Sequence, residues 1–190
     1  KYFHEVEGYR TKTVLEIFEN RDPSIEQTIM KPGVLNVGTT EPHRAKLNLG
    51  GYPQIKFRPL TFDQMDWGKS YTDLPIIRYA EILLIYAEAK AELGTLTQDD
   101  INNTINLIRQ RAGMPDASLD DWLANIDPVQ EERYSNVQSS QKGAVLEVRR
   151  ERRIELACEG FRYGDLMRWG CGKLFEAAPE GAYIRGLGYY

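Results

Sequence analysis

The sequence predicts a mainly α-helical protein, built of tetratricopeptide-like helical hairpins joined by long irregular loops. After Pro75, apolar residues recur at spacings of three and four, the period of an amphipathic helix. Short turns with Gly or Pro separate these segments, so consecutive helices must fold back on each other. Before Pro75, Gly and Pro interrupt the chain often. We therefore expect a loop-rich segment with short extended pieces at 1–74, helical hairpins at 75–176 and a C-terminal loop at 177–190, all in one domain of a longer parent.

Composition and charge restrict the class of protein. With 190 residues, 42% hydrophobic and 27% charged, the chain resembles one soluble globular domain. Its net charge of -4 argues against a nucleic-acid partner, because neutralising phosphates requires an excess of Lys and Arg. The chain begins at Lys1 without a signal peptide, and no apolar stretch is long enough to cross a membrane. We expect the N-terminal part of the parent to be missing. Cys158 and Cys171 make no disulfide framework, and both a single bridge and two free thiols remain open.

The loop-rich segment is expected to contain little regular structure. Residues 9–18 fit an extended or weakly helical conformation, and 21–23 indicates a turn because Pro keeps its predecessor out of the helical region. From 31 to 73 we expect loop, with one hairpin at most and a short extended piece at 54–57.

The first helical hairpin is expected at 78–112. Its first helix runs over 78–93 and ends at Gly94, which suits a left-handed C-terminal cap. Its second helix begins at Thr97, which forms a capping-box pattern with Asp100, and continues to Ala112. The apolar stripes expected to be buried together are Ile82, Ile85, Tyr86, Ala89 and Leu93 on the first helix and Ile101, Ile105, Ile108 and Ala112 on the second.

Three further helices are expected after Pro115. A short helix covers 118–126, and the polar segment 127–141 connects it to a long helix at 144–159. Gly160 ends the long helix and precedes a last short one. About three such hairpins are needed to bury a continuous core, so we expect the apolar face left open by two hairpins to be covered by helices upstream of this chain.

Charged residues follow an unusual order over 147–169. Glu147, Glu151, Glu155 and Glu159 succeed each other at i+4, as do Arg149 and Arg153. Like charges at this spacing cost roughly 0.2–0.5 kcal/mol per pair. Their partners must therefore come from other helices or from neighbours at i+3.

Three segments resemble the signature of the SusD/RagB family. Residues 78–89 match R-x-A-E-x-x-L-x-x-A-E-A, and residues 105–115 match I-N-x-I-R-x-R-A-G-M-P. Residues 149–169 match R-x-E-R-x-x-E-L-x-x-E-G-x-R-x-x-D-L-x-R-W, with Gly164 where the family often has an aromatic or polar residue. The resemblance covers roughly 20–175 and indicates the C-terminal portion of such a protein. The signature residues, which we expect to hold the fold, are Arg78, Glu81, Glu88, Arg109, Arg111, Arg149, Glu151, Arg152, Arg153, Glu155, Glu159, Arg162, Asp165, Arg168 and Trp169.

The resemblance implies a function outside catalysis. It implies a surface-exposed outer-membrane lipoprotein, attached to the membrane only by a lipid anchor on the missing N-terminal part. Such a protein binds a glycan or starch-type oligosaccharide and delivers it to a SusC-like TonB-dependent transporter. Binding of an oligopeptide, as in a RagB-type lid, is the alternative within the family. A tetratricopeptide-like scaffold for a partner protein is the alternative outside it.

The residues themselves give no indication of an enzyme. His4 and His43 lie alone in expected loops, with no nucleophile or carboxylate motif beside them, and we expect neither a cofactor nor a metal site. Ligand binding is expected to use aromatic side chains on loops, because a sugar ring can stack on an aromatic face. The candidate ligand-binding residues are Tyr52, Trp67, Tyr71 and Arg44. These aromatic residues can equally pack the loop onto the helices.

Overall fold

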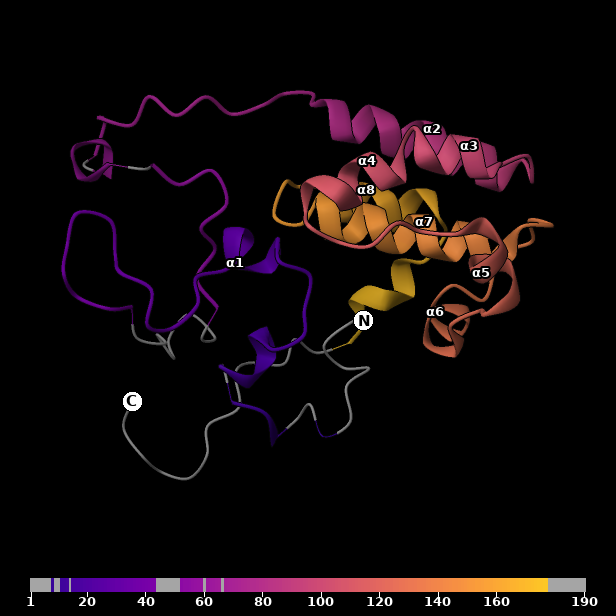
Figure 1. Ribbon diagram of the computed structural model, residues 1–190, viewed down its shortest axis with the longest axis horizontal. Helices are drawn as coiled ribbons and strands as arrows, with labels where there is room; N and C mark the ends of the chain where they lie inside the picture. Colours follow the sequence, from indigo (N-terminus) through magenta and orange to yellow (C-terminus); the bar gives the residue numbers. More distant parts are fainter. Residues whose placement is uncertain are drawn as a thin grey trace. The chain divides into compact units, whose positions relative to one another are not determined.

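The computed structural model describes residues 8, 11–13, 15–43, 52–59, 61–65 and 67–177 (Figure 1). The chain separates into two compact units, Lys1–Pro75 with Pro179–Tyr190, and Ile76–Ala178. Regular structure in the described residues is helical, apart from isolated β-bridges. The expected mainly α-helical fold class is confirmed. Of the described helices, none is both long enough and apolar enough to span a bilayer.

The first unit contains short elements linked by loops. Because Gly and Pro recur through 31–75, regular elements end before they reach three turns. Two isolated antiparallel bridges, Ile29 with Gln54 and Leu35 with Pro42, hold the loops together. The described elements of this unit are η3 (Glu16–Phe18), α1 (Ile25–Thr28) and η5 (Phe62–Met65).

The second unit begins with α2 (Tyr79–Glu92), whose buried side differs from the expected one. The helix buries Leu84, Ala87, Glu88 and Ala91. The expected stripe is exposed instead, with Ile85 47% and Leu93 76% exposed. The predicted stripe was wrong because α2 carries apolar residues on two opposite sides, and periodicity alone does not decide which side packs. The buried side packs chiefly against α7 (Lys142–Glu155) (Figure 1).

The expected helix over 97–112 is broken into α3 (Gln98–Asn102) and α4 (Ile105–Arg111). At the break, Asn103 Nδ2 donates to the Asp99 carbonyl at 2.8 Å and Thr104 Oγ1 donates to the Asp100 carbonyl at 2.5 Å. Asn and Thr side chains compete in this way with the backbone bonds of a helix, which explains the interruption. The expected capping box of Thr97 with Asp100 is present at the start of α3.

The segment 127–141 contains a helix that was not expected. After α5 (Leu119–Ala124), α6 runs over Pro128–Arg133. Asp127 caps it by accepting a hydrogen bond from the Val129 N–H at 2.8 Å, and Pro128 occupies the first turn, where the absent N–H costs nothing. The adjacent residues Asp127 and Pro128 could therefore have predicted the start of this helix.

The long helix α7 begins and ends earlier than expected, at Lys142 and Glu155. Gly143 allows it to approach α5 closely, because a Cβ at this position would stand 2.0 Å from the Trp122 carbonyl oxygen. Gly160 adopts φ +86° between α7 and α8 (Phe161–Arg168), and η6 (Gly172–Phe175) follows. The main core includes Leu84, Leu96, Ile101, Ile105, Trp122, Tyr134, Val145, Val148, Leu166 and Trp169.

Candidate functional site

The predicted ligand-binding aromatic residues take different positions in the first unit. Trp67 is 100% exposed and Tyr71 is 73% exposed, so both rings are open to solvent. Tyr52 packs instead against the small apolar cluster of Ile17 and Phe18, and its burial raises the pKa of its hydroxyl. Arg44 lies outside the described residues. The geometry leaves Trp67 and Tyr71 as the accessible stacking surfaces among the three aromatic candidates.

Phe62 is an exposed aromatic that the sequence reasoning did not select. It begins the short helix η5 and is 64% exposed, in the same Gly- and Pro-rich region as Trp67. Its position between Thr61 and Asp63 gives no periodic pattern. Only the general rule that loop aromatics serve recognition could have pointed to it.

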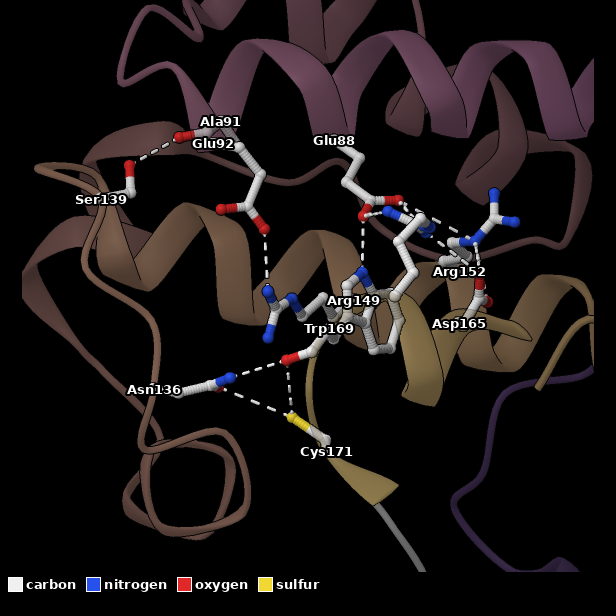
Figure 2. Close-up of polar contacts among 11 residues, drawn as sticks. Glu88, Ala91, Glu92, Asn136, Ser139, Arg149, Arg152, Asp165, Trp169 and Cys171 are labelled. Carbon is white, nitrogen blue, oxygen red and sulfur yellow. Dashed lines mark hydrogen bonds and ion pairs between the residues drawn. The ribbon is translucent and has the colours of Figure 1, made fainter. Parts of the chain in front are cut away.

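The signature residues of the second unit meet in three groups of ion pairs. The first group, here called the Glu88 cluster, consists of Glu88, Arg152, Asp165, Arg168 and Trp169. Figure 2 shows Glu88 reaching from α2 toward the indole of Trp169, which donates a hydrogen bond to the carboxylate at 2.6 Å. Arg168 donates to the same carboxylate, with one bond of 3.1 Å, and also to Asp165 at 3.1 Å. Arg152 Nε lies 2.8 Å and 2.9 Å from the two oxygens of Asp165.

The Glu88 cluster is buried and electrically balanced. Two carboxylates face two guanidinium groups; Glu88, Arg152 and Asp165 are each 5% exposed, whereas the Arg168 side chain is 52% exposed and reaches the cluster from the surface. Ionised groups are stable in such a place only when paired and hydrogen-bonded, because removing them from water is costly. The cluster therefore joins α2, α7 and the end of α8 through complementary charges.

Arg149 extends this cluster with aromatic contacts. Its guanidinium carbon lies 4.8 Å from the ring centroid of Trp169 and 5.3 Å from that of Tyr134. These two rings meet edge to face at 5.7 Å. Arg149 also pairs with Glu92 of α2 at 2.9 Å (Figure 2). Arg162 donates a hydrogen bond to the Tyr134 hydroxyl at 3.0 Å. A buried guanidinium group that has few carboxylates to pair with can be stabilised by stacking on the faces of aromatic rings.

The second group, the Arg78 cluster, joins the start of α2 to the ends of α4 and α7. Arg78 donates to both oxygens of Glu159 at 2.7 Å and to the Glu155 carbonyl at 2.8 Å. Arg111 donates a hydrogen bond to the side-chain oxygen Oε2 of Glu155 at 2.6 Å. Burial alone would lower the pKa of Arg78, but the hydrogen bonds that it donates to Glu159 and Glu155 outweigh the burial and raise that pKa. Arg78 and Arg111 thus balance Glu155 and Glu159, the last two of the four carboxylates that recur at i+4 from Glu147 and are here called the Glu ladder.

The third group lies along the middle of α7. Arg109 of α4 pairs with Glu151 and donates to the Pro115 carbonyl at 2.7 Å. Arg150 pairs with Asp127, the cap of α6, and with Glu147 at 3.0 Å. Burial raises the pKa of Glu147 to about 7, although the charge of Arg150 acts in the opposite direction.

Glu81 does not join these groups. It is half-buried in the first turn of α2 and takes part in none of the ion pairs found within the described residues. Arg153 is half-buried on α7.

Several residues that fix this framework were missed by the sequence reasoning. The Gln141 side chain spans the backbone of Leu96, accepting from its N–H at 2.9 Å and donating to its carbonyl at 2.8 Å. Asn136 donates to the Trp169 carbonyl at 2.6 Å, and Ser139 donates to the Ala91 carbonyl at 2.7 Å (Figure 2). These residues lie in the polar segment 127–141, where neither a helical spacing of apolar residues nor an unusual order of charges pointed to them.

The charged side chains of the three groups pair with each other and so join the helices of the second unit. Each group of carboxylates faces guanidinium donors at bonding distance, which keeps the charges neutralised in place. Within the described ranges, no group of three or more His, Cys, Asp or Glu side chains is arranged to hold a metal ion. Cys158 is an exposed free thiol and Cys171 a buried one, so the single bridge left open by the sequence is not formed.

Comparison with known proteins identifies the family. The sequence model of the SusD family matches residues 3–186. A solved SusD-like carbohydrate-binding protein from Bacteroides fragilis NCTC 9343 is 27% identical, with a TM-score of 0.56 over 85% of this chain. The match spans 30% of the length of that protein. No curated protein matches the sequence. The match over nearly the whole chain, together with the three motifs that meet in the ion-pair groups, shows that the chain belongs to the SusD family.

Proposed function

We propose that this chain is part of a cell-surface protein that binds an oligosaccharide, of glycan or starch type, and delivers it to a SusC-like TonB-dependent transporter. Family membership is the observation that carries the proposal, because the similar protein from Bacteroides fragilis is a SusD-like carbohydrate-binding protein. SusD-family proteins are generally associated with the outer membrane. A surface-exposed lipoprotein, anchored through a lipid outside these 190 residues, fits that association.

The family and the similar structure point to a binding protein rather than to an enzyme. The exposed aromatic side chains of the first unit support this role. A pyranose ring presents C–H groups on one face, and an exposed aromatic ring offers a complementary apolar surface. Trp67, whose side chain is fully exposed, is the largest such surface among the predicted candidates, and Tyr71 is the second.

The test is binding of defined oligosaccharides to the intact protein, measured by glycan array and then by isothermal titration calorimetry. Trp67→Ala is expected to weaken binding of the best oligosaccharide at least about tenfold, which corresponds to ~1.4 kcal/mol. Trp67→Tyr is the matched control, because it keeps an aromatic face and is expected to retain most of the affinity. Tyr71→Ala is compared with Tyr71→Phe in the same way.

Three results would contradict the proposal or a part of it. Absence of binding to every oligosaccharide, together with binding of oligopeptides, would replace the ligand class. Unchanged affinity in both alanine variants would remove Trp67 and Tyr71 from the site. Failure of the protein to co-purify with a SusC-like transporter would exclude the delivery role while leaving carbohydrate binding intact.

A further inference from the structure

A hydrogen-bonded hairpin runs over residues 33–43 of the first unit. Leu35 forms an isolated antiparallel bridge with Pro42, and the His43 N–H donates to the Val34 carbonyl at 2.7 Å. A short isolated hairpin is only marginally stable in water, so its shape depends on further bonds. In this hairpin, the further bonds lie at the tip.

Polar side chains lock the tip of the 33–43 hairpin. The backbone N–H of Asn36 and its side-chain Nδ2 both donate to the Glu41 carbonyl, at 3.1 and 3.2 Å. The Thr39 hydroxyl donates to the Asn36 carbonyl at 3.2 Å and accepts a hydrogen bond from the Glu41 N–H at 3.3 Å. Because backbone and side-chain bonds close the same turn, residues 36–41 form a defined support for whatever packs on them.

Gly38 lies at this tip and touches the side chain of Phe62. A Cβ added to Gly38 would stand 2.3 Å from the Phe62 Cβ, 2.7 Å from its Cγ and 2.8 Å from its Cδ2. Gly38 also has φ +72°, a backbone conformation that glycine adopts without strain. The absence of a side chain at position 38 therefore lets one edge of the Phe62 ring rest directly on the backbone of the hairpin.

The first unit leaves the rest of the Phe62 ring open. Phe62 is 64% exposed, although its Cβ and one ring edge are held by Gly38. Neither of the two apolar clusters found in the described residues includes Phe62. A ring that is fixed on one edge loses little freedom when a ligand stacks on it, which favours binding. The contact with the hairpin thus prepares this ring for recognition without burying it in a core.

We propose that Phe62 is a stacking surface for a pyranose ring of the bound oligosaccharide, and that Gly38 is a positioning residue that holds the Phe62 ring in place. Both roles depend on the proposed binding of an oligosaccharide. The matching ligand group is the C–H face of a sugar ring, because an aromatic face offers apolar contact and no hydrogen bond to a hydroxyl. A glycine is required at position 38 because any side chain there would displace Phe62.

Two glycines of the same hairpin separate positioning of the ring from strain of the backbone. Gly38 and Gly33 have φ +72° and +91°, so alanine strains the backbone at either position. At Gly33 nothing lies within 4 Å of the added Cβ, whereas at Gly38 the added Cβ displaces Phe62. In the intact protein, calorimetry is expected to show that Gly38→Ala weakens binding of the best oligosaccharide at least about fivefold. Gly33→Ala is the matched control and is expected to weaken it less than about twofold.

Substitutions at Phe62 complete a double-mutant cycle. Phe62→Leu removes the aromatic face and keeps an apolar side chain, so it is expected to weaken binding about tenfold. Phe62→Tyr keeps the face and is expected to retain most of the affinity. In the Phe62→Leu background, Gly38→Ala is expected to weaken binding by less than about twofold more, because no ring remains to be positioned.

Hydroxyl-radical footprinting of the intact protein gives a readout that needs no variant. Mass spectrometry is expected to show that Phe62 is oxidised readily in the free protein. Saturating oligosaccharide is expected to slow this oxidation at least about twofold, because a stacked sugar covers one of the two ring faces. Phe18, which is buried, serves as the reference and is expected to stay unreactive in both states.

The outcomes distinguish this site from the proposed function as a whole. An unreactive Phe62 in the free protein would overturn the proposal, because the ring would then be covered by another part of the protein. Oligosaccharide binding that leaves Phe62 unprotected, or equal losses of affinity in Gly38→Ala and Gly33→Ala, would overturn the proposal and leave carbohydrate binding intact. Absence of binding to every oligosaccharide would overturn both.

Discussion

Removing the charge of Asp165 is expected to be among the most destabilising conservative changes in the second unit. Asp165 and Arg152 are each 5% exposed, and Arg152 Nε donates to both carboxylate oxygens at 2.8 and 2.9 Å. The Glu88 cluster sums to zero charge, from two carboxylates and two guanidinium groups. Asp165→Asn leaves the cluster at +1 and removes the carboxylate that pairs with the buried Arg152, while the other cation, Arg168, has a 52% exposed side chain. Breaking a buried ion pair in this way costs about 3–5 kcal/mol. Because Glu88 lies only 3.9 Å from Arg152 Nε and can compensate in part, we expect about 3 kcal/mol.

The assay uses the distribution of tryptophan between the two units. The chain has Trp67 in the first unit and Trp122 and Trp169 in the second. In residues 1–190 with Trp67→Phe, urea unfolding followed by tryptophan fluorescence therefore reports on the second unit alone. With a slope of about 2 kcal/mol per M, the expected loss lowers the unfolding midpoint by about 1.5 M. Glu132→Gln, an exposed acid on α6, is the matched control and is expected to change stability by less than about 0.5 kcal/mol.

A double replacement separates charge balance from packing. Arg152→Met with Asp165→Leu removes one charge of each sign and leaves Glu88 paired with Arg168. Apolar replacement of a whole buried pair is often neutral, so the double variant is expected to recover most of the stability lost by Asp165→Asn. The reasoning would be refuted by a midpoint shift below about 0.3 M for Asp165→Asn. It would also be refuted by a double variant no more stable than the single one.

Three further predictions follow from local geometry. Glu147→Gln is expected to stabilise the protein at pH 8 by up to about 3 kcal/mol and to have little effect at pH 4, measured by urea unfolding across pH. The reason is that the folded protein holds this proton up to about pH 7, whereas the unfolded carboxyl releases it near 4.5, so wild-type stability falls as pH rises through that window. Gly143→Ala is expected to lower the melting temperature through a cost of about 1–3 kcal/mol, since the new Cβ would stand 2.0 Å from the Trp122 carbonyl oxygen. In native protein, titration with a thiol reagent is expected to show fast reaction at Cys158 alone, and reaction at Cys171 only after unfolding.

Local features of this fold could be predicted from the sequence because their signals are short. Gly94 and the capping box of Thr97 with Asp100 lie within a few residues of the helix ends that they determine, whereas α7 ends at Glu155, before Gly160. The Asp-Pro start of α6 was equally local and was overlooked. The break between α3 and α4 could not be seen in the apolar period, because Ile101, Ile105 and Ile108 keep a helical spacing across it.

Long-range features could not be predicted because several partners satisfy the same local pattern. Glu88 is bound by Trp169 and Arg168, which lie 81 and 80 residues away. The sequence shows many Arg residues that could take this role. Tyr52 and Trp67 illustrate the same limit for the candidate site, because both are loop aromatics, yet one packs on Ile17 and Phe18 and the other is open to solvent. Burial depends on the path of the whole loop, which residue spacing does not specify.

The distribution of ion pairs explains how a repetitive charge pattern can specify one arrangement. The Glu ladder on α7 repeats every four residues, so a slip of α4 by one turn, about 5.4 Å, would still bring Arg109 opposite a carboxylate. The ladder alone is therefore degenerate. Arg78, at the start of α2, fixes the register of α2 against α7, because its guanidinium contacts both Glu155, the last residue of α7, and Glu159, the last carboxylate of the ladder. The bond from Trp169 to Glu88 fixes α2 against the end of α8 independently of the ladder. Buried ionic groups that add little net stability can thus be retained because they select one helix register among several.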